Sequence, residues 1–343
     1  MGNLLRILSI DGGGIRGILP GQILVALEEK LQILSGNPNS RLADYFDLFA
    51  GTSTGGILTC LYLFPDKDGR PRFTAEEAVD IYLKNGGGIF KEDLRQQLVS
   101  LNGFIEEKYP SADIESLLMN YFGEKKLSEL LKPCLITSYN IFSRNTHFFT
   151  QHDAREKEGY DYYVRDVARA TSAAPTYFEP ARVTSMSGVS YPLVDGGVFA
   201  NNPAMCAYAE ARQQFKRGSL DKNVTAVDMF ILSVGTGSVK ESYDYDKAAG
   251  WGSLGWIHPV LDVMMSGASD TIDFQLKQIF DAVDRQGHYF RINPEIGEAD
   301  TEMDNASEKN LKSLKEAGIA TAERHDEELN KIASILIKNT PMV

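Results

Sequence analysis

A serine flanked by glycines lies between a predicted strand and a predicted helix. Residues 51–55, "GTSTG", match the pattern G-x-S-x-G, which is typical of a nucleophile elbow. A tight turn there exposes the serine oxygen, and the amino end of the following helix favours developing negative charge. Gly51 and Gly55 leave room for a strained backbone and for a substrate. The pattern predicts Ser53 as a nucleophile, and the alternative is a structural turn capped by Thr52 or Ser53.

A nucleophilic serine needs a base, and Asp195 is the candidate. It lies in "YPLVDGGVFANNP" at the end of another predicted strand, beside Gly196 and Gly197, which would let a second segment approach closely. Taken alone, Asp-Gly is also a common turn dipeptide. Asp195 gains weight only when it is considered together with Ser53.

Three consecutive glycines follow the first apolar run, in "ILSIDGGGIRGI" at residues 7–18. Ester cleavage passes through an oxyanion, and each backbone N–H aimed at that oxygen is worth about 3–4 kcal/mol. Glycines before a helix supply such donors with no side chain in the way. The loop of Gly12, Gly13 and Gly14 is therefore a candidate oxyanion hole.

The same loop also satisfies the dinucleotide fingerprint G-x-G-x-x-G through Gly12, Gly14 and Gly17. That fold requires an acidic residue at the end of its second strand to hold the ribose. Here the second predicted strand ends in Gly-Thr-Ser, and Asp44 and Asp47 precede or begin it. The dinucleotide hypothesis is therefore disfavoured.

The blocks "SIDGGGIRGILP", "GTSTGG" and "LVDGG" resemble the three signature blocks of the patatin family of lipid acyl hydrolases, and the plant patatins most of all. The likeness continues through "ATSAAPTYFEP", "LSVGTG" and "TEMDNASE" and so covers nearly the whole chain. It implies a Ser–Asp dyad, with Ser53 as nucleophile, Asp195 as general base, and Gly12, Gly13 and Gly14 as the oxyanion hole. Supporting positions would be Gly51, Gly55, Gly196 and Arg16. The Arg16 side chain would steady the loop or the substrate head, or else it would be a plain surface arginine.

The resemblance further implies a lipid acyl hydrolase that cleaves fatty acyl esters of phospholipids or galactolipids through an acyl-enzyme. We expect no cofactor and no metal, since no cluster of Asp, Glu, His or Cys has metal-ligand spacing. The expected partner is a lipid substrate, with transient contact at a membrane surface. Oligomeric state is not predicted.

Two alternatives remain open. The first is an α/β-hydrolase triad in the order Ser, Asp, His, which Ser53, Asp195 and His288 could supply. Of the five histidines, His147 and His152 precede Asp195, and His325 lies in a charged helix. The second alternative is an acidic storage or scaffold protein that merely keeps the hydrolase fold.

The elements that must position these residues follow a repeated strand–turn–helix pattern. Strands are predicted at 6–10, 45–50, 135–139, 191–194 and 227–234, and apolar residues at helical spacing follow the first two. This order predicts an α/β fold with a mostly parallel central sheet covered by helices, a three-layer α/β/α architecture of the patatin type. We expect one domain over residues 1–343, helical from about residue 245, where Asn305 or Ser307 would cap a helix.

Composition narrows the class of partner. The 343 residues carry a formal net charge of −12, which argues against nucleic acid and against a polybasic grip on anionic membranes. Three widely spaced cysteines, with no metal or disulfide spacing, indicate reduced thiols. No signal peptide or membrane-spanning stretch is evident, so the expected location is the cytoplasm.

Overall fold

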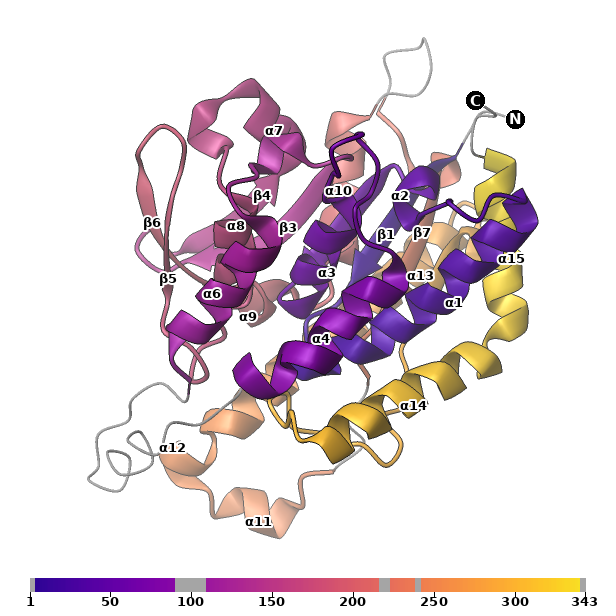
Figure 1. The fold of residues 1–343 in the computed structure, drawn as a ribbon. Helices are drawn as coiled ribbons and strands as arrows, with labels where there is room; N and C mark the ends of the chain where they lie inside the picture. The colour runs from indigo at the N-terminus through magenta and orange to yellow at the C-terminus, as the bar shows by residue number, and fades with distance from the viewer. Residues whose placement is uncertain (1–3, 90–108, 216–222, 238–241, 340–343) are drawn as a thin grey trace.

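The computed structural model describes residues 4–89, 109–215, 223–237 and 242–339. Within them, eight strands form one mixed sheet in the order β5-β6-β3-β2-β1-β7-β8, and β4 pairs with β3 (Figure 1). The strands are β1 (Leu5–Ile10), β2 (Leu48–Thr52), β3 (Cys134–Asn140), β4 (Asn145–Thr150), β5 (Ala181–Thr184), β6 (Ser190–Asp195), β7 (Met229–Val234) and β8 (Tyr289–Ile292).

The pairs β1–β2, β1–β7, β2–β3 and β7–β8 are parallel, whereas β4, β5 and β6 pair antiparallel. The mostly parallel sheet predicted from the sequence is therefore present, with an antiparallel extension at one side. Parallel strands are buried on both faces and need crossover helices. The apolar runs of β1, β2 and β7, all of them almost wholly buried, fit that requirement.

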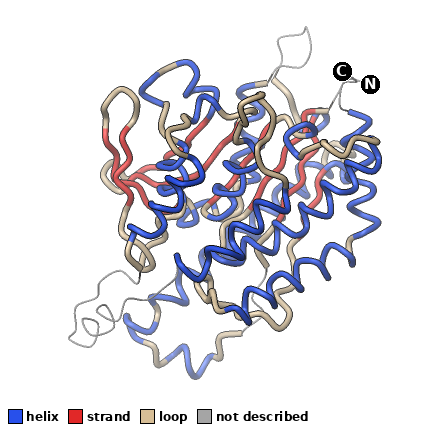
Figure 2. The backbone as a smooth tube through the Cα atoms, viewed as in Figure 1, coloured by secondary structure: helices blue, strands red, loops and turns tan. Residues whose placement is uncertain are grey.

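Helices cover both faces of the sheet (Figure 2). Successive side chains of a strand point to opposite faces, and β1 shows this directly. Leu8 packs in the core formed with α1 and α3, whereas Ile7 packs with α10 and α13. The helices are α1 (Ile18–Ser35), α2 (Leu42–Tyr45), α3 (Thr54–Leu63), α4 (Ala75–Ile89), α6 (Ser111–Phe122), α7 (Gln151–Glu156), α8 (Val164–Thr171), α9 (Gly197–Ala200), α10 (Ala204–Gln214), α11 (Tyr245–Ala249), α12 (Gly252–Gly255), α13 (Ile257–Asp281), α14 (Glu308–Arg324) and α15 (Asp326–Asn339).

The predicted elements agree with those observed to within a few residues, and the three-layer α/β/α prediction is confirmed. Ser307 is the N-cap of α14, where its side chain accepts a hydrogen bond from the Asn310 N–H at 3.4 Å. Strands β4, β5 and β8 were not predicted. No helix in the described residues combines the length and the apolarity needed to cross a membrane.

The topology brings the predicted site residues to one edge of the sheet. Strands β1 and β2 are parallel and end at Ile10 and Thr52, so the loops that carry the glycines and Ser53 emerge side by side. Strand β6 runs antiparallel to β3 and ends at Asp195, which pairs with Ser138. Because β3 is parallel to β2, with Thr137 opposite Thr52, the end of β6 meets the same edge.

Candidate active site

Ser53 occupies the turn between β2 and α3 with φ 54° and ψ −123°. Non-glycine residues rarely adopt this backbone conformation, and it costs of order 1–3 kcal/mol. The Ser53 N–H donates a hydrogen bond to Thr171 Oγ1 at 2.9 Å, which helps to hold the strained turn. The serine therefore lies on a sharp elbow, as the G-x-S-x-G pattern predicts.

The elbow is packed so tightly against its neighbours that side chains are excluded on both sides of Ser53. A Cβ at Gly55 would overlap the backbone carbonyl oxygen of Ile10, and one at Gly51 would overlap the carbonyl of Gly55. Gly196 is in the same position, because a Cβ there would collide with Thr137. These three glycines are needed for close approach of the β1, β2, β3 and β6 segments.

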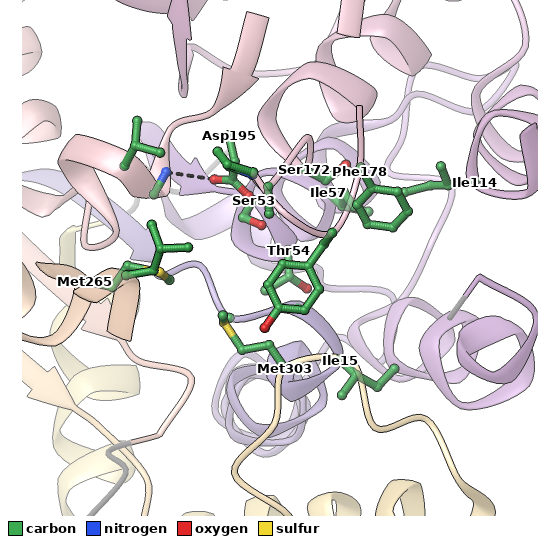
Figure 3. Close-up of a pocket in the computed structure, with 18 of the residues that line it drawn as sticks. Ile15, Ser53, Thr54, Ile57, Ile114, Ser172, Phe178, Asp195, Met265 and Met303 are labelled. Carbon is green, nitrogen blue, oxygen red and sulfur yellow. Dashed lines mark hydrogen bonds between the residues drawn. The ribbon is translucent and has the colours of Figure 1, made fainter. Parts of the chain in front are cut away.

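Asp195 lies at the end of β6, is 4% exposed, and lines the same pocket as Ser53. Its carboxylate accepts a hydrogen bond from the Gly197 N–H at 2.7 Å. Burial raises the pKa of Asp195 from 3.8 to about 7, although the neighbouring Ser53 side chain and the Gly197 N–H oppose this rise. The structure thus brings the two residues together, with apolar side chains around them (Figure 3).

The glycine loop approaches the serine from β1. Gly13 and Gly14 line the pocket, and Gly14 begins a 3-10 helix (η1, Gly14–Gly17), whose first amides have no partner within the helix. Gly14 has φ 59°, and a Cβ there would overlap the Met303 carbonyl oxygen. Among the described residues neither the Gly13 amide nor the Gly14 amide has a hydrogen-bond acceptor, so both remain candidate oxyanion donors.

Gly12 differs from its two neighbours. Its N–H donates to the Asn201 carbonyl at 3.0 Å, so in this conformation that amide is already engaged and does not face the pocket. The expectation that all three glycine amides serve the oxyanion therefore needs correction at Gly12. Its role here is to tie the loop to the segment that follows Asp195.

Arg16 is buried, and the surface alternative for this residue is wrong. It is 6% exposed, its Nε donates to the Gly13 carbonyl at 3.5 Å, and its Nη1 has no hydrogen-bond partner among the described residues. Burial lowers the pKa of Arg16, and Asp262 opposes this effect. The side chain therefore contacts the glycine loop at Gly13.

The pocket around Ser53 is overwhelmingly apolar. Only a few polar groups, including Ser53 and Asp195, interrupt a lining of aliphatic, aromatic and thioether side chains that includes Ile15, Ile57, Ile114, Phe178, Met265 and Met303 (Figure 3). No histidine belongs to the lining among residues that the structure describes. Such a pocket suits a hydrocarbon chain better than a charged group.

Sequence reasoning missed two contributors to this site. Thr171, which binds the Ser53 N–H, lies in the "ATSAAP" block that carries part of the family resemblance. Asp11 forms a buried ion pair with Arg291 at 2.6 Å and so fixes the start of the glycine loop. Asp11 lies next to the loop in sequence, but nothing in the sequence alone links it to Arg291.

The histidines whose side chains are described do not line the pocket. His288 lies beside the backbone of Met229, at the start of β7, whereas the glycine loop packs at the opposite end of this strand, where the Asp11 N–H bonds Val234. The ring of His147 packs against Phe149 with centroids 4.6 Å apart, and burial lowers its pKa to about 4. The side chain of His258 lies outside the described residues.

Comparison with known proteins supports the resemblance seen in the motifs. The family described as Patatin-like phospholipase matches residues 8–208. The chain is 38% identical to Patatin-like protein 2 of Arabidopsis thaliana, over 92% of this chain and 82% of that protein. It is 33% identical to Patatin group J-1 of Solanum tuberosum, over 97% and 90% of the two chains. It is also 33% identical to Probable inactive patatin-3-Kuras 1 of Solanum tuberosum, over 93% of this chain and 86% of that protein. The chain therefore belongs to the patatin-like phospholipase family.

Proposed function

We propose that this protein is a lipid acyl hydrolase that cleaves fatty acyl esters of phospholipids or galactolipids through a Ser53–Asp195 dyad. The observation that carries the proposal is that Ser53, on a strained elbow, and the buried carboxylate of Asp195 line one pocket whose other side chains are mostly apolar. Family membership supports the class of reaction but does not guarantee activity, because one relative is named as probably inactive.

In the first step, Asp195 takes the hydroxyl proton as the Ser53 oxygen attacks the ester carbonyl carbon. The carbonyl oxygen becomes an oxyanion, and the amides of Gly13 and Gly14 donate to it. The ester C–O bond then breaks, and the leaving alcohol takes the proton from Asp195. The fatty acyl group remains on Ser53 as an ester.

In the second step, water replaces the alcohol. Asp195 accepts a proton from the water as its oxygen attacks the acyl carbon, and the same amides stabilise the second oxyanion. Collapse releases the fatty acid and returns the proton to Ser53. Asp195 can do this without histidine because burial brings its pKa close to neutral pH, where a general base is most effective.

The test is hydrolysis of a short-chain p-nitrophenyl ester, followed by mass spectrometry of a lipid mixture after incubation with the protein. Ser53→Ala should lower turnover at least about 10³-fold, because the nucleophile is removed. Ser9→Ala is the matched control. Ser9 is buried in β1, and its hydroxyl has no partner among the described residues, so its loss should leave activity within about twofold.

The outcome separates the enzyme from the alternative that the chain is a storage or scaffold protein. Equal turnover by the wild type and Ser53→Ala would favour that alternative and end the proposal. The lipid profile identifies the ester: fatty acids released by the wild type and absent with Ser53→Ala define the headgroup and the chain that are cleaved.

A further inference from the structure

An exposed apolar stripe runs along the first half of α13. Trp256, Val260, Val263 and Met264 are each 39–53% exposed. Their spacing of four, seven and eight residues puts them on one side of the helix. A helix side that faces only water normally carries polar or charged residues, so this stripe requires an explanation.

Aromatic side chains extend the stripe toward α11 and α12. The rings of Tyr243 and Trp251 lie 5.1 Å apart, and those of Trp251 and Trp256 lie 5.0 Å apart, both edge to face. Tyr245, at the start of α11, is 82% exposed. Figure 1 shows α11 and α12 together at one edge of the molecule. We call Tyr243, Tyr245, Trp256, Val260, Val263 and Met264 the aromatic face.

The aromatic face is continuous with the candidate active site. Met264 belongs to it and also lines the pocket of Ser53 and Asp195, and the adjacent Leu261 and Met265 line that pocket too. A ligand lying against the aromatic face would therefore meet the pocket at Leu261, Met264 and Met265, which are all apolar. Long acyl chains are held in lipid aggregates and leave them for water only at a cost of about 0.8 kcal/mol per methylene.

We propose that the aromatic face docks on the surface of a lipid bilayer, so that an acyl chain passes from the bilayer into the pocket without crossing water. The choice of lipid as the occupant rests on the proposed function. Tryptophan and tyrosine favour the boundary between headgroups and hydrocarbon, because one part of each ring system is apolar and the other is polar. This composition fits a membrane boundary.

The charges around the aromatic face indicate which lipid headgroups the bilayer would carry. Asp244, Asp246 and Asp270 are exposed on the same helices or beside them, and the whole chain carries a net charge of −12. Anionic lipids attract basic segments and repel carboxylates. The surface therefore fits a bilayer of electrically neutral headgroups, such as zwitterionic phosphocholine.

The chain's two tryptophans, Trp251 and Trp256, both belong to this region, so intrinsic fluorescence reports directly on docking. The Ser53→Ala protein is mixed with phosphatidylcholine vesicles, which it cannot hydrolyse under the proposed mechanism. We expect a blue shift of tryptophan emission and flotation of the protein with the vesicles. Vesicles made with phosphatidylglycerol should bind it more weakly.

Variants locate the contact. Val260→Ser combined with Val263→Ser should weaken vesicle binding by about tenfold, because two side chains no longer enter the apolar layer. Neither valine is among the described residues that line the pocket, so turnover of the soluble ester should not change. Ile33→Ser combined with Leu34→Ser is the matched control. Ile33 and Leu34 are 77% and 50% exposed at the end of α1, a helix that contributes nothing to the aromatic face, so their loss should leave vesicle binding unchanged.

Three results would overturn the proposal: no shift or flotation at any lipid concentration, equal loss of vesicle binding in the Ile33→Ser, Leu34→Ser control, or tighter binding to anionic than to neutral vesicles. The tryptophan emission could instead shift with protein concentration in the absence of lipid, and sedimentation could show dimers. Those two results together would mean that the aromatic face is an interface between two copies of this chain. Failure of the proposed function is distinguishable, because it appears as absent turnover of the soluble ester while vesicle binding persists.

Discussion

At the scale of single residues, the site depends on the environment of one carboxylate. An exposed aspartate is a weak base, because it is ionised at every pH above about 4. Burial of Asp195 raises its pKa to about 7, and the neighbouring Ser53 side chain and the Gly197 N–H limit the rise by favouring the charged form. The side chain can therefore hold a proton transiently near neutral pH, which in other hydrolases is the work of a histidine.

Activity should consequently increase with pH. Asp195 can accept the Ser53 proton only when it is deprotonated, so kcat/KM for a soluble ester should rise through an apparent pKa near 7. At pH 5 the deprotonated fraction, and hence the rate, should be about 100-fold lower than its plateau. A profile of kcat/KM between pH 4.5 and 9 measures this. A flat profile down to pH 5 would mean that Asp195 is not the base.

The same pKa shift predicts a gain in stability when the charge is removed. The folded pKa of about 7 lies above the ordinary 3.8, so the folded protein loses stability relative to the unfolded chain as pH rises from about 4 to 7. Asp195→Asn avoids this loss. At pH 8 its free energy of unfolding should exceed that of the wild type by up to about 4 kcal/mol, and at pH 4 the two should be nearly equal.

Urea unfolding at pH 4 and pH 8 measures both differences. The Asp195→Asn protein should also lose ester hydrolysis, so that gain of stability and loss of activity appear in one variant. The difference in free energy of unfolding between Asp195→Asn and the wild type could instead be the same at pH 8 and at pH 4. That result would mean that the negative charge of Asp195 does not destabilise the folded protein.

At the scale of elements, one short segment at the carboxyl end of α8 connects both members of the dyad. Thr171 Oγ1 accepts the Ser53 N–H at 2.9 Å and donates to the Thr137 carbonyl at 2.7 Å. Two residues later, the Ala173 carbonyl accepts the Asp195 N–H at 2.9 Å. The segment thus fixes the strained elbow and the end of β6 relative to each other, and Thr171 acts as a positioning residue.

Thr171→Val tests this role, because it preserves side-chain shape and removes the acceptor. The buried Ser53 N–H would lose its partner, which costs about 1–3 kcal/mol, and the serine would be held less accurately. We expect kcat to fall at least about tenfold with KM little changed, and Thr171→Ser to restore most of it. Steady-state kinetics on the soluble ester provide both numbers.

Thr59→Val is the matched control. Thr59 is also fully buried, on α3, but its hydroxyl has no partner among the described residues, so the change should leave kcat unaltered. Equal effects of the two threonine variants would assign Thr171 to general packing.

The comparison of sequence with structure shows which information is local. The strands before the glycine loop and Ser53 could be predicted, because each is a continuous apolar run that ends in glycines. Strand β8 could not, because "YFRI" is four residues long and contains Arg291, whose charge is compensated by a partner 280 positions away. Likewise, the three-glycine pattern did not reveal that the Gly12 amide is bonded to Asn201, since that contact depends on how the chain returns after Asp195.

At the scale of the whole molecule, the direction of the strands separates the dyad from His288. The loops after β1 and β2 emerge at the carboxyl ends of parallel strands, where ligands bind in open α/β sheets. Asp195 reaches the same edge because β6 runs antiparallel to β3. His288 lies near Met229, at the amino end of β7. The six-residue length of β7 separates it from the glycine-loop end of that strand by roughly 17 Å.

His288→Ala should therefore keep kcat/KM for the soluble ester within about threefold of the wild type, because general acid–base roles require hydrogen-bond reach. His258→Ala belongs in the same assay. No histidine with a described side chain lines the pocket, but the side chain of His258 lies outside the described residues, so its role must be tested directly. If the carboxylate alone serves as base, both variants stay active while Ser53→Ala does not. A fall of either one to the level of Ser53→Ala would replace the dyad by a triad, and it would require the chain near that histidine to rearrange toward Asp195 during turnover.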